Sequence, residues 1–117
     1  MILCVKNLRV SGILGVNQEE RGVERQILIN VRIEYDAGKA VITDAVEDAL
    51  DYKHLRDCIV KVIQGTKHKL LETLADAIAR ELATDARISK LDLEVDKPNA
   101  LRLAESVAAV IHWERSR

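Results

Sequence analysis

The period of the hydrophobic pattern changes twice along this chain, and the order of the changes limits the possible folds more than any other feature. Ile2–Leu14 is rich in β-branched and aliphatic residues, and apolar side chains alternate along residues 26–35, so both segments are predicted strands. In residues 51–65 and 69–83 the apolar side chains recur every three or four positions, which predicts two amphipathic helices. Two further alternating segments predict two more strands, at residues 91–95 and 107–113.

The predicted order β-β-α-α-β-β puts both helices together in the middle of the chain. This segregation is typical of an α+β fold with an antiparallel sheet, here of four strands with the two helices on one face. At 117 residues the chain is predicted to form one domain, residues 1–117. The second face of the last strand includes Ala108 and Val110, so the sheet is partly apolar on both faces and we expect contacts between subunits.

The charge balance argues against several classes of partner. The chain has 18 Lys and Arg against 19 Asp and Glu, whereas proteins that bind nucleic acid or anionic membranes normally have a basic excess. No apolar run approaches the roughly 20 residues that span a bilayer, and the N-terminus lacks the pattern of a signal peptide. Cys4 and Cys58 form no C-x-x-C pair, so we expect two buried free thiols and a cytoplasmic protein.

The residues able to carry chemistry form no strong motif on their own. His54, His68 and His112 are scattered and make no zinc-binding pattern, and there is no glycine-rich phosphate loop, so we expect neither a metal nor a cofactor. Weaker signals remain, and each taken alone is more typical of a surface or packing residue than of a site. They are Glu19-Glu20-Arg21, Tyr52, Glu72 and Lys97-Pro98.

Taken together and in order, a set of short segments resembles the dihydroneopterin aldolase family of folate biosynthesis, which includes the dihydroneopterin triphosphate epimerases. The segments are Gly15-Val16 with Glu19-Glu20-Arg21, Gln26 at a strand start, Ala49-Leu50-Asp51-Tyr52, Leu70-Leu71-Glu72-Thr73-Leu74-Ala75, and Asp96-Lys97-Pro98-Asn99-Ala100. The resemblance covers the whole chain. It implies the tunnelling fold, a homo-oligomeric ring that is a tetramer or a pair of stacked rings, and pterin sites between neighbouring subunits.

The resemblance also implies a reaction and a role for each matching residue. The family cleaves 7,8-dihydroneopterin by a retro-aldol reaction into 6-hydroxymethyl-7,8-dihydropterin and glycolaldehyde, without a metal or Schiff base. Lys97 matches the acid/base lysine, and Tyr52 matches the residue that stacks on the pterin and assists proton delivery. Glu72 matches the carboxylate that accepts two parallel N–H bonds from the pterin. Backbone groups at Leu71 and Leu50 complete the pterin edge, and Glu20 matches the loop glutamate on the substrate side chain.

The sequence leaves the exact activity open. The loop between Gly15 and Gln26 is one residue longer than the commonest family pattern, and we assign its glutamate to Glu20 rather than to the Arg21 position. We expect an aldolase acting on free dihydroneopterin. A triphosphate 2′-epimerase is the alternative, for which Arg21 and Arg102 are the cations available near the site. A non-catalytic ring-forming interaction module is the third possibility.

Overall fold

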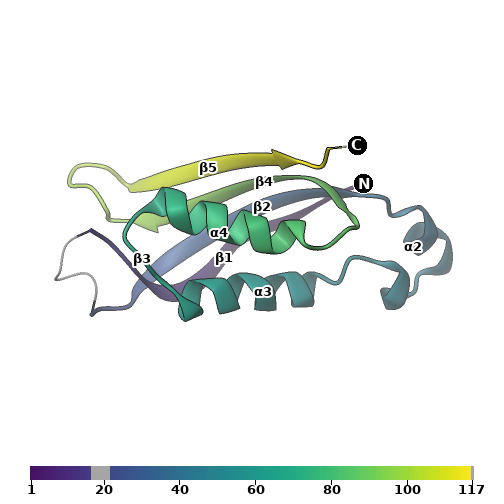
Figure 1. Ribbon diagram of the computed structural model, residues 1–117, viewed down its shortest axis with the longest axis horizontal. Helices are drawn as coiled ribbons and strands as arrows, with labels where there is room; N and C mark the ends of the chain where they lie inside the picture. Colours follow the sequence, from purple (N-terminus) through teal and green to yellow (C-terminus); the bar gives the residue numbers. More distant parts are fainter. Residues whose placement is uncertain (17–21, 117) are drawn as a thin grey trace.

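The computed structural model describes residues 1–16 and 22–116 and has two layers, a sheet and a pair of helices (Figure 1). The sheet contains β1 (Ile2–Leu14), β2 (Arg25–Tyr35), β3 (Lys67–His68), β4 (Ile88–Pro98) and β5 (Ser106–Glu114). The helices are α2 (Gly38–Thr43), the 3₁₀ helix η1 (Val46–Asp48), α3 (Tyr52–Gly65) and α4 (Leu71–Ala83). No helix within these described ranges is long and apolar enough to cross a membrane.

The four long strands form the antiparallel sheet that the sequence predicts, in the order β1-β2-β4-β5. β3 adds a short fifth strand that runs parallel to the end of β1, with Ile13 opposite Lys67 and Leu14 opposite His68. A two-residue strand has no period of its own, so the sequence pattern gives no sign of it. β4 and β5 run further towards their hairpin than the alternation indicates, because the ladder continues to Pro98 opposite Ser106.

An irregularity in β1 keeps both of its ends on the core. The register against β2 shifts between Val5 and Leu8, where Asn7 takes a left-handed φ of 52°. Asparagine tolerates this conformation better than most residues. Asn30 holds it in place, since its Oδ1 accepts a 2.8 Å hydrogen bond from the Asn7 backbone N–H. Leu3 and Val5 before the shift, like Leu8 after it, therefore pack against the core.

The helices α3 and α4 cover one face of the sheet, as predicted (Figure 1). Their buried residues follow the apolar stripes, and they pack on the inward residues of the central strands. α3 begins at Tyr52 because the side chain of Asp51 caps it, accepting a 2.9 Å hydrogen bond from the Lys53 backbone N–H. The core is aliphatic apart from Tyr35, and it contains the following fully enclosed residues: Ile27, Ile29, Ile33, Leu55, Ile59, Ile78, Ile88, Leu91 and Leu93.

The segment between the second strand and the first long helix holds α2 and η1, which the sequence pattern does not predict because six and three residues are too few to show a helical period. One expectation about local structure is wrong. Cys4 is exposed rather than buried, because it alternates with Leu3 and Val5 on β1 and lies on the opposite face. Cys58 is partly buried on α3, and both thiols are free.

The domain is elongated rather than round. Its extents are 51 × 23 × 23 Å, and its radius of gyration of 15.3 Å exceeds the roughly 13 Å of a compact chain of this length. The β4–β5 hairpin lies at one end of the long axis and α2 at the other (Figure 1). This shape separates residues at the two ends of the long helices.

Candidate active site

Lys97 and Leu71, two of the predicted site residues, lie together at the hairpin end of the domain. Lys97 is the second-last residue of β4 and pairs with Val107 of β5, while Leu71 is the first residue of α4. Both line a pocket of about 350 Å³ together with Leu14, Gly15 and the hairpin residue Leu101. Lys97 also lines a neighbouring pocket of about 410 Å³ with Gln26 and Asn99. The segments joined by these pockets are those that carry the family resemblance.

Glu72 follows the pocket residue Leu71 and is exposed on the first turn of α4. A carboxylate is stabilised at a helix N-terminus by the helix dipole. The turn is fixed by Thr73, whose hydroxyl donates to the Leu70 carbonyl oxygen at 3.0 Å and lies 3.1 Å from His68 Nδ1. The Leu70 side chain does not cap the helix, so the first-turn N–H groups at Leu71 and Glu72 have no side-chain acceptor from it. A carboxylate and backbone N–H groups lie side by side here.

Tyr52 and Leu50, the other two described site residues, lie together at the α2 end. Tyr52 is the first residue of α3 and its side chain is 60% exposed, whereas Leu50 is only 3% exposed and anchors the segment in the core. Both line a pocket of about 260 Å³ with Val46, Ala49 and Lys53. An exposed tyrosine ring next to an anchored backbone offers a flat apolar surface for a planar ligand.

The two pairs are far apart within one chain. α3 has 14 residues and is about 21 Å long. Tyr52 is its first residue, and the pocket lined by Lys97 and Leu71 lies beyond its last residue. The chain therefore brings Lys97 to Leu71 and Tyr52 to Leu50, but it does not join the two pairs. We call them the Lys97 half-site and the Tyr52 half-site. Each pocket is close to the lower end of the roughly 300–1,000 Å³ of small-molecule sites.

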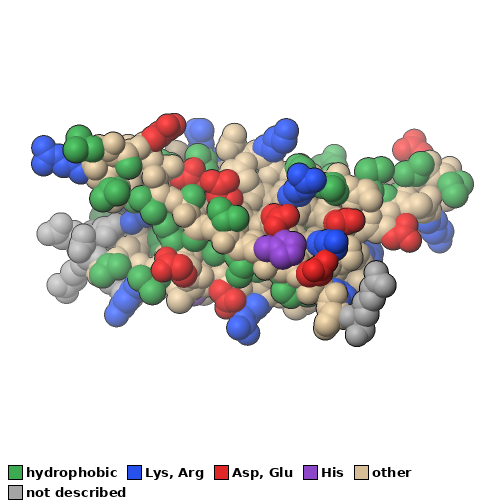
Figure 2. All heavy atoms as spheres, turned by 90° about the horizontal axis from the view of Figure 1, so that it is seen from above, with side chains coloured by type: hydrophobic (Ala, Val, Ile, Leu, Met, Phe, Trp, Pro, Cys, Tyr) green, Lys and Arg blue, Asp and Glu red, His purple; other side chains and the backbone are tan. Residues whose placement is uncertain are grey.

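Exposed apolar side chains gather at both ends of the molecule, with acidic and basic side chains interspersed between them (Figure 2). At the α2 end, Val41 is 68% and Ile42 85% exposed. At the hairpin end, Leu103 is fully exposed and has a strained left-handed φ of 74°. Solvent-exposed apolar patches and strained residues of this kind mark surfaces that contact a partner or ligand.

Glu20 and Arg21 lie outside the described residues, as does Glu19. Arg102 is exposed in the β4–β5 hairpin, on the chain segment that follows Lys97. Among residues 1–16 and 22–116, no three His, Cys, Asp or Glu side chains are grouped so that they could bind a metal ion.

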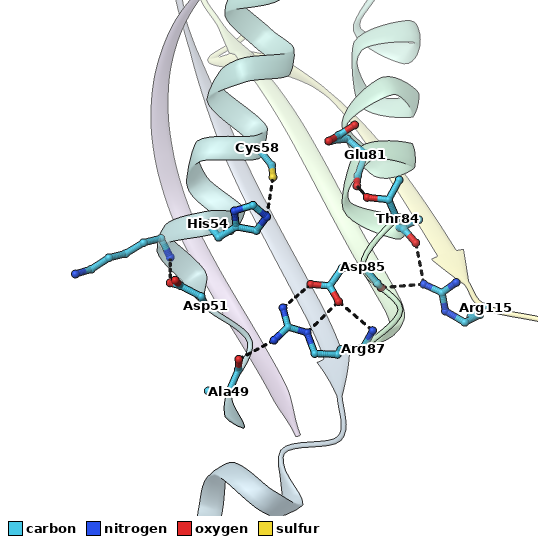
Figure 3. Close-up of polar contacts among 11 residues, drawn as sticks. Ala49, Asp51, His54, Cys58, Glu81, Thr84, Asp85, Arg87 and Arg115 are labelled. Atoms are coloured by element: carbon cyan, nitrogen blue, oxygen red, sulfur yellow. Dashed lines mark hydrogen bonds and ion pairs between the residues drawn. The ribbon is translucent and has the colours of Figure 1, made fainter. Parts of the chain in front are cut away.

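A network of charged residues near the Tyr52 half-site was not predicted from the sequence. Asp85 and Arg87 pair between α4 and β4, and Arg87 also reaches the carbonyl oxygen of Ala49 (Figure 3). The hydrogen bond from the Arg87 side chain is the main cause that lowers the pKa of Asp85, and the same bond raises the pKa of Arg87. Only the Asp-x-Arg spacing at a helix end hints at this pair in the sequence, and nothing there indicates the carbonyl partner.

Comparison with known proteins assigns the chain and its fold to one family. The family model for dihydroneopterin aldolase (FolB) matches residues 3–112 of this chain. The chain belongs to the dihydroneopterin aldolase family. It is 32% identical over 114 residues to the dihydroneopterin triphosphate 2′-epimerase of Escherichia coli K12, covering 97% of this chain and 95% of that protein. It is 26% identical over 110 residues to the dihydroneopterin aldolase of the same strain, covering 94% and 90%.

Solved structures agree with this assignment. The structure of E. coli dihydroneopterin aldolase in complex with neopterin superposes with a TM-score of 0.92 at 25% identity, covering 97% of this chain and 98% of that one. Urate oxidase from Bacillus subtilis 168 has a TM-score of 0.69 at 11% identity, covering 97% of this chain and 46% of that one, and this likeness concerns the fold alone. The tunnelling fold implied by the sequence is thereby confirmed.

Proposed function

We propose that this protein cleaves the side chain of 7,8-dihydroneopterin by a retro-aldol reaction, at sites that two copies of the chain form together. The observation that carries the proposal is the division of the five described family residues into two half-sites at opposite ends of α3, with Lys97, Leu71 and Glu72 at one end and Tyr52 and Leu50 at the other. Neither half-site alone offers both the Tyr52 ring and the family-matched lysine, Lys97. A neighbouring copy that brings its Tyr52 half-site to the Lys97 half-site completes the set, and the exposed apolar residues at both ends provide surface for that contact.

The chemistry requires three tasks from the joined site. Glu72 accepts two parallel N–H bonds from the pterin ring and fixes its orientation. Tyr52 of the neighbouring copy covers the ring, while the backbone at Leu50 and Leu71 binds its edge. Lys97 moves protons: one leaves the 2′-hydroxyl as the adjacent carbon–carbon bond breaks, and one is returned to the resulting enamine carbon. The electrons of the broken bond pass into the pterin imine.

The second candidate function is 2′-epimerisation of dihydroneopterin triphosphate, which uses the same bond cleavage followed by re-addition of the aldehyde. The higher identity to the E. coli epimerase, 32% against 26% for the aldolase, favours it. A triphosphate requires cations near the leaving fragment, and Arg102 lies in the hairpin next to Lys97. The balanced overall charge provides no basic field to add to this arginine.

Product analysis distinguishes the two functions. The purified protein is incubated separately with dihydroneopterin and with its triphosphate, and the products are separated by chromatography. The aldolase predicts 6-hydroxymethyl-7,8-dihydropterin and free glycolaldehyde from dihydroneopterin. Conversion of the triphosphate to its 2′ isomer without released aldehyde assigns the epimerase instead. If neither substrate changes, both the aldolase and the epimerase activity are contradicted. The non-catalytic ring-forming interaction module is then the remaining possibility.

Two substitutions at the Lys97 half-site separate binding from chemistry. Glu72→Gln replaces one acceptor with a donor that faces a pterin N–H, so we expect weaker pterin binding and a higher KM. Lys97→Ala removes the acid/base group, so we expect kcat to fall at least ~10²-fold with binding largely kept. Steady-state kinetics and titration with neopterin measure both. If Glu72→Gln and Lys97→Ala weaken pterin binding equally and leave kcat unchanged, Lys97 only anchors the substrate.

A further inference from the structure

The segment that carries the Tyr52 half-site is bonded by Arg87 to a corner of the domain that Arg115 also holds. This arrangement follows from the antiparallel packing of the long helices, which places the end of α4 beside the start of α3 (Figure 3). Residues 83–88 form the tight corner between α4 and β4, and Ala49 precedes α3 closely. The corner therefore faces the backbone that positions Leu50 and Tyr52.

Arg87 connects the two segments through both sides of its guanidinium group. Its Nε and Nη2 donate to the two carboxylate oxygens of Asp85 at 3.0 and 2.7 Å, a bidentate pair. Its Nη1 donates to the Ala49 carbonyl oxygen at 2.9 Å. The Arg87 backbone N–H adds a 3.0 Å bond to Asp85. With Nε and Nη2 bonded to Asp85, the Nη1 group is fixed in direction towards Ala49.

Arg115, after β5, holds the same corner from the opposite side. Its Nη2 donates to the carbonyl oxygens of Ala83 at 2.8 Å and Asp85 at 3.0 Å, and its Nε donates to that of Ile88 at 3.0 Å. Its guanidinium also stacks 4.8 Å above the Trp113 ring. The corner is thus a rigid support for Arg87 rather than a flexible turn.

The bond from Arg87 ties the segment before α3 to a distant part of the chain. The hydrogen bonds within this segment are local: the Ala49 N–H donates to the Val46 carbonyl oxygen, and Asp51 caps α3. The buried Leu50 side chain fixes the depth of the segment, but it leaves rotation of the peptide possible. The Ala49 carbonyl belongs to the peptide that contains the Leu50 N–H, so a fixed Ala49 oxygen fixes the direction of that N–H.

We propose that Arg87 is a positioning residue for the substrate, acting through the Ala49–Leu50 peptide and the Tyr52 ring. The inference rests on the proposed function, because it requires that the Tyr52 half-site binds a pterin. Backbone N–H and C=O groups recognise a pterin edge only when they are held within a fraction of an ångström and about 10–20°. Arg87 supplies that constraint from outside the pocket, without touching the ligand.

Loss of the hydrogen bond from Arg87 to the Ala49 carbonyl oxygen is expected to weaken ligand binding more than it slows the chemical step. In Arg87→Ala the Ala49–Leu50 peptide loses its support, and we expect neopterin to bind about tenfold more weakly, as for the loss of one charge-assisted hydrogen bond. The KM for the substrate rises with it, while kcat changes less because the hydrogen bond from Arg87 to Ala49 does not hold Lys97, the residue proposed to move protons. Arg87→Lys keeps a cation beside Asp85 but lacks the second arm, so it behaves like Arg87→Ala in binding while keeping the fold. Arg80→Ala is the matched control, because it removes an arginine bonded to Asp76 at 2.7 Å on the exposed side of α4.

Mixed oligomers test whether Arg87 acts on the Tyr52 half-site specifically. Chains with Tyr52→Ala and chains with Glu72→Gln are co-expressed, and random assembly restores both halves at about a quarter of the sites. Arg87→Ala co-expressed with Glu72→Gln should regain a fraction of sites with full neopterin affinity, whereas Arg87→Ala with Tyr52→Ala should not. Recovery of full neopterin affinity by this second mixture, or wild-type affinity of Arg87→Ala alone, would overturn the positioning role. If Tyr52→Ala and Glu72→Gln also fail to complement each other, the shared site of the proposed function fails, and the inference fails with it.

Discussion

Gly12 of β1 lies directly against Ile63 of α3, and replacing it with alanine tests that contact. A Cβ at position 12 would overlap Cγ2 of Ile63 and lie 3.3 Å from Cδ1 of Ile27. Carbon atoms prefer separations of about 3.5–4.0 Å. Ile63 is 2% exposed and Ile27 fully buried, so neither side chain has space to rotate away and α3 must move. We expect Gly12→Ala to lower the free energy of unfolding by about 1–3 kcal/mol, the usual cost of overpacking a core.

Gly65 provides a control with the opposite expected sign. It ends α3 and does not adopt the left-handed backbone, and a methyl group added to its Cα would have no heavy atom within 4 Å. Gly65→Ala should therefore raise the free energy of unfolding by about 0.4–1 kcal/mol, through a less flexible unfolded chain. Urea titration of the three proteins measures both changes at one subunit concentration, because the stability of an oligomer depends on concentration. A Gly12→Ala protein as stable as the wild type would refute the tight β1–α3 contact.

Three further predictions concern the charged network, the thiol and the hairpin. The pKa of Asp85 is lowered in the folded protein, so the stabilisation from this carboxylate is complete above its ordinary pKa of 3.8 and is lost as the pH falls through the lowered value. The difference in unfolding free energy between the wild type and Asp85→Asn should therefore shrink on acidification. Burial, then the charges of Glu81 and Asp57, raise the pKa of Cys58 above 9.0, so in a Cys4→Ser background iodoacetamide should modify it more slowly than a small free thiol at the same pH. Leu103→Gly relieves the strain of the left-handed backbone but removes an exposed apolar side chain. Light scattering should therefore show weaker assembly of the subunits, while circular dichroism should show no loss of secondary structure.

The sequence predicts the parts of the fold that have a clear period. The alternation of β2 and the apolar stripes of α3 and α4 are long enough to identify each element, and their order identifies the α+β class. The six residues of α2 and the two of β3 are too short for that signal, and β3 is defined by its pairing with the end of β1. The bulge at Asn7 depends on Asn30, 23 residues away, which no local pattern contains.

The candidate site, like the fold, could be predicted from the sequence only in part. Lys97, Glu72 and Tyr52 are named by motifs that resemble a known family, and family membership is confirmed. The separation of the Lys97 and Tyr52 half-sites follows from the length of α3, which a motif does not convey. The Arg87 bond joins a side chain to the carbonyl oxygen of Ala49, 38 positions earlier, and every residue has such an oxygen. A contact to a backbone atom does not depend on the type of residue that provides the atom, so only the structure reveals such contacts.

The mass of the protein in solution tests the shared site most directly. Multi-angle light scattering at micromolar subunit concentration, with and without neopterin, measures that mass against the 13.1 kDa of one chain. The shared site predicts a stable multiple of 13.1 kDa that binds neopterin and loses binding when Tyr52→Ala is introduced. A 13.1 kDa monomer that still binds neopterin would contradict it, because the Lys97 and Tyr52 half-sites cannot meet within one chain.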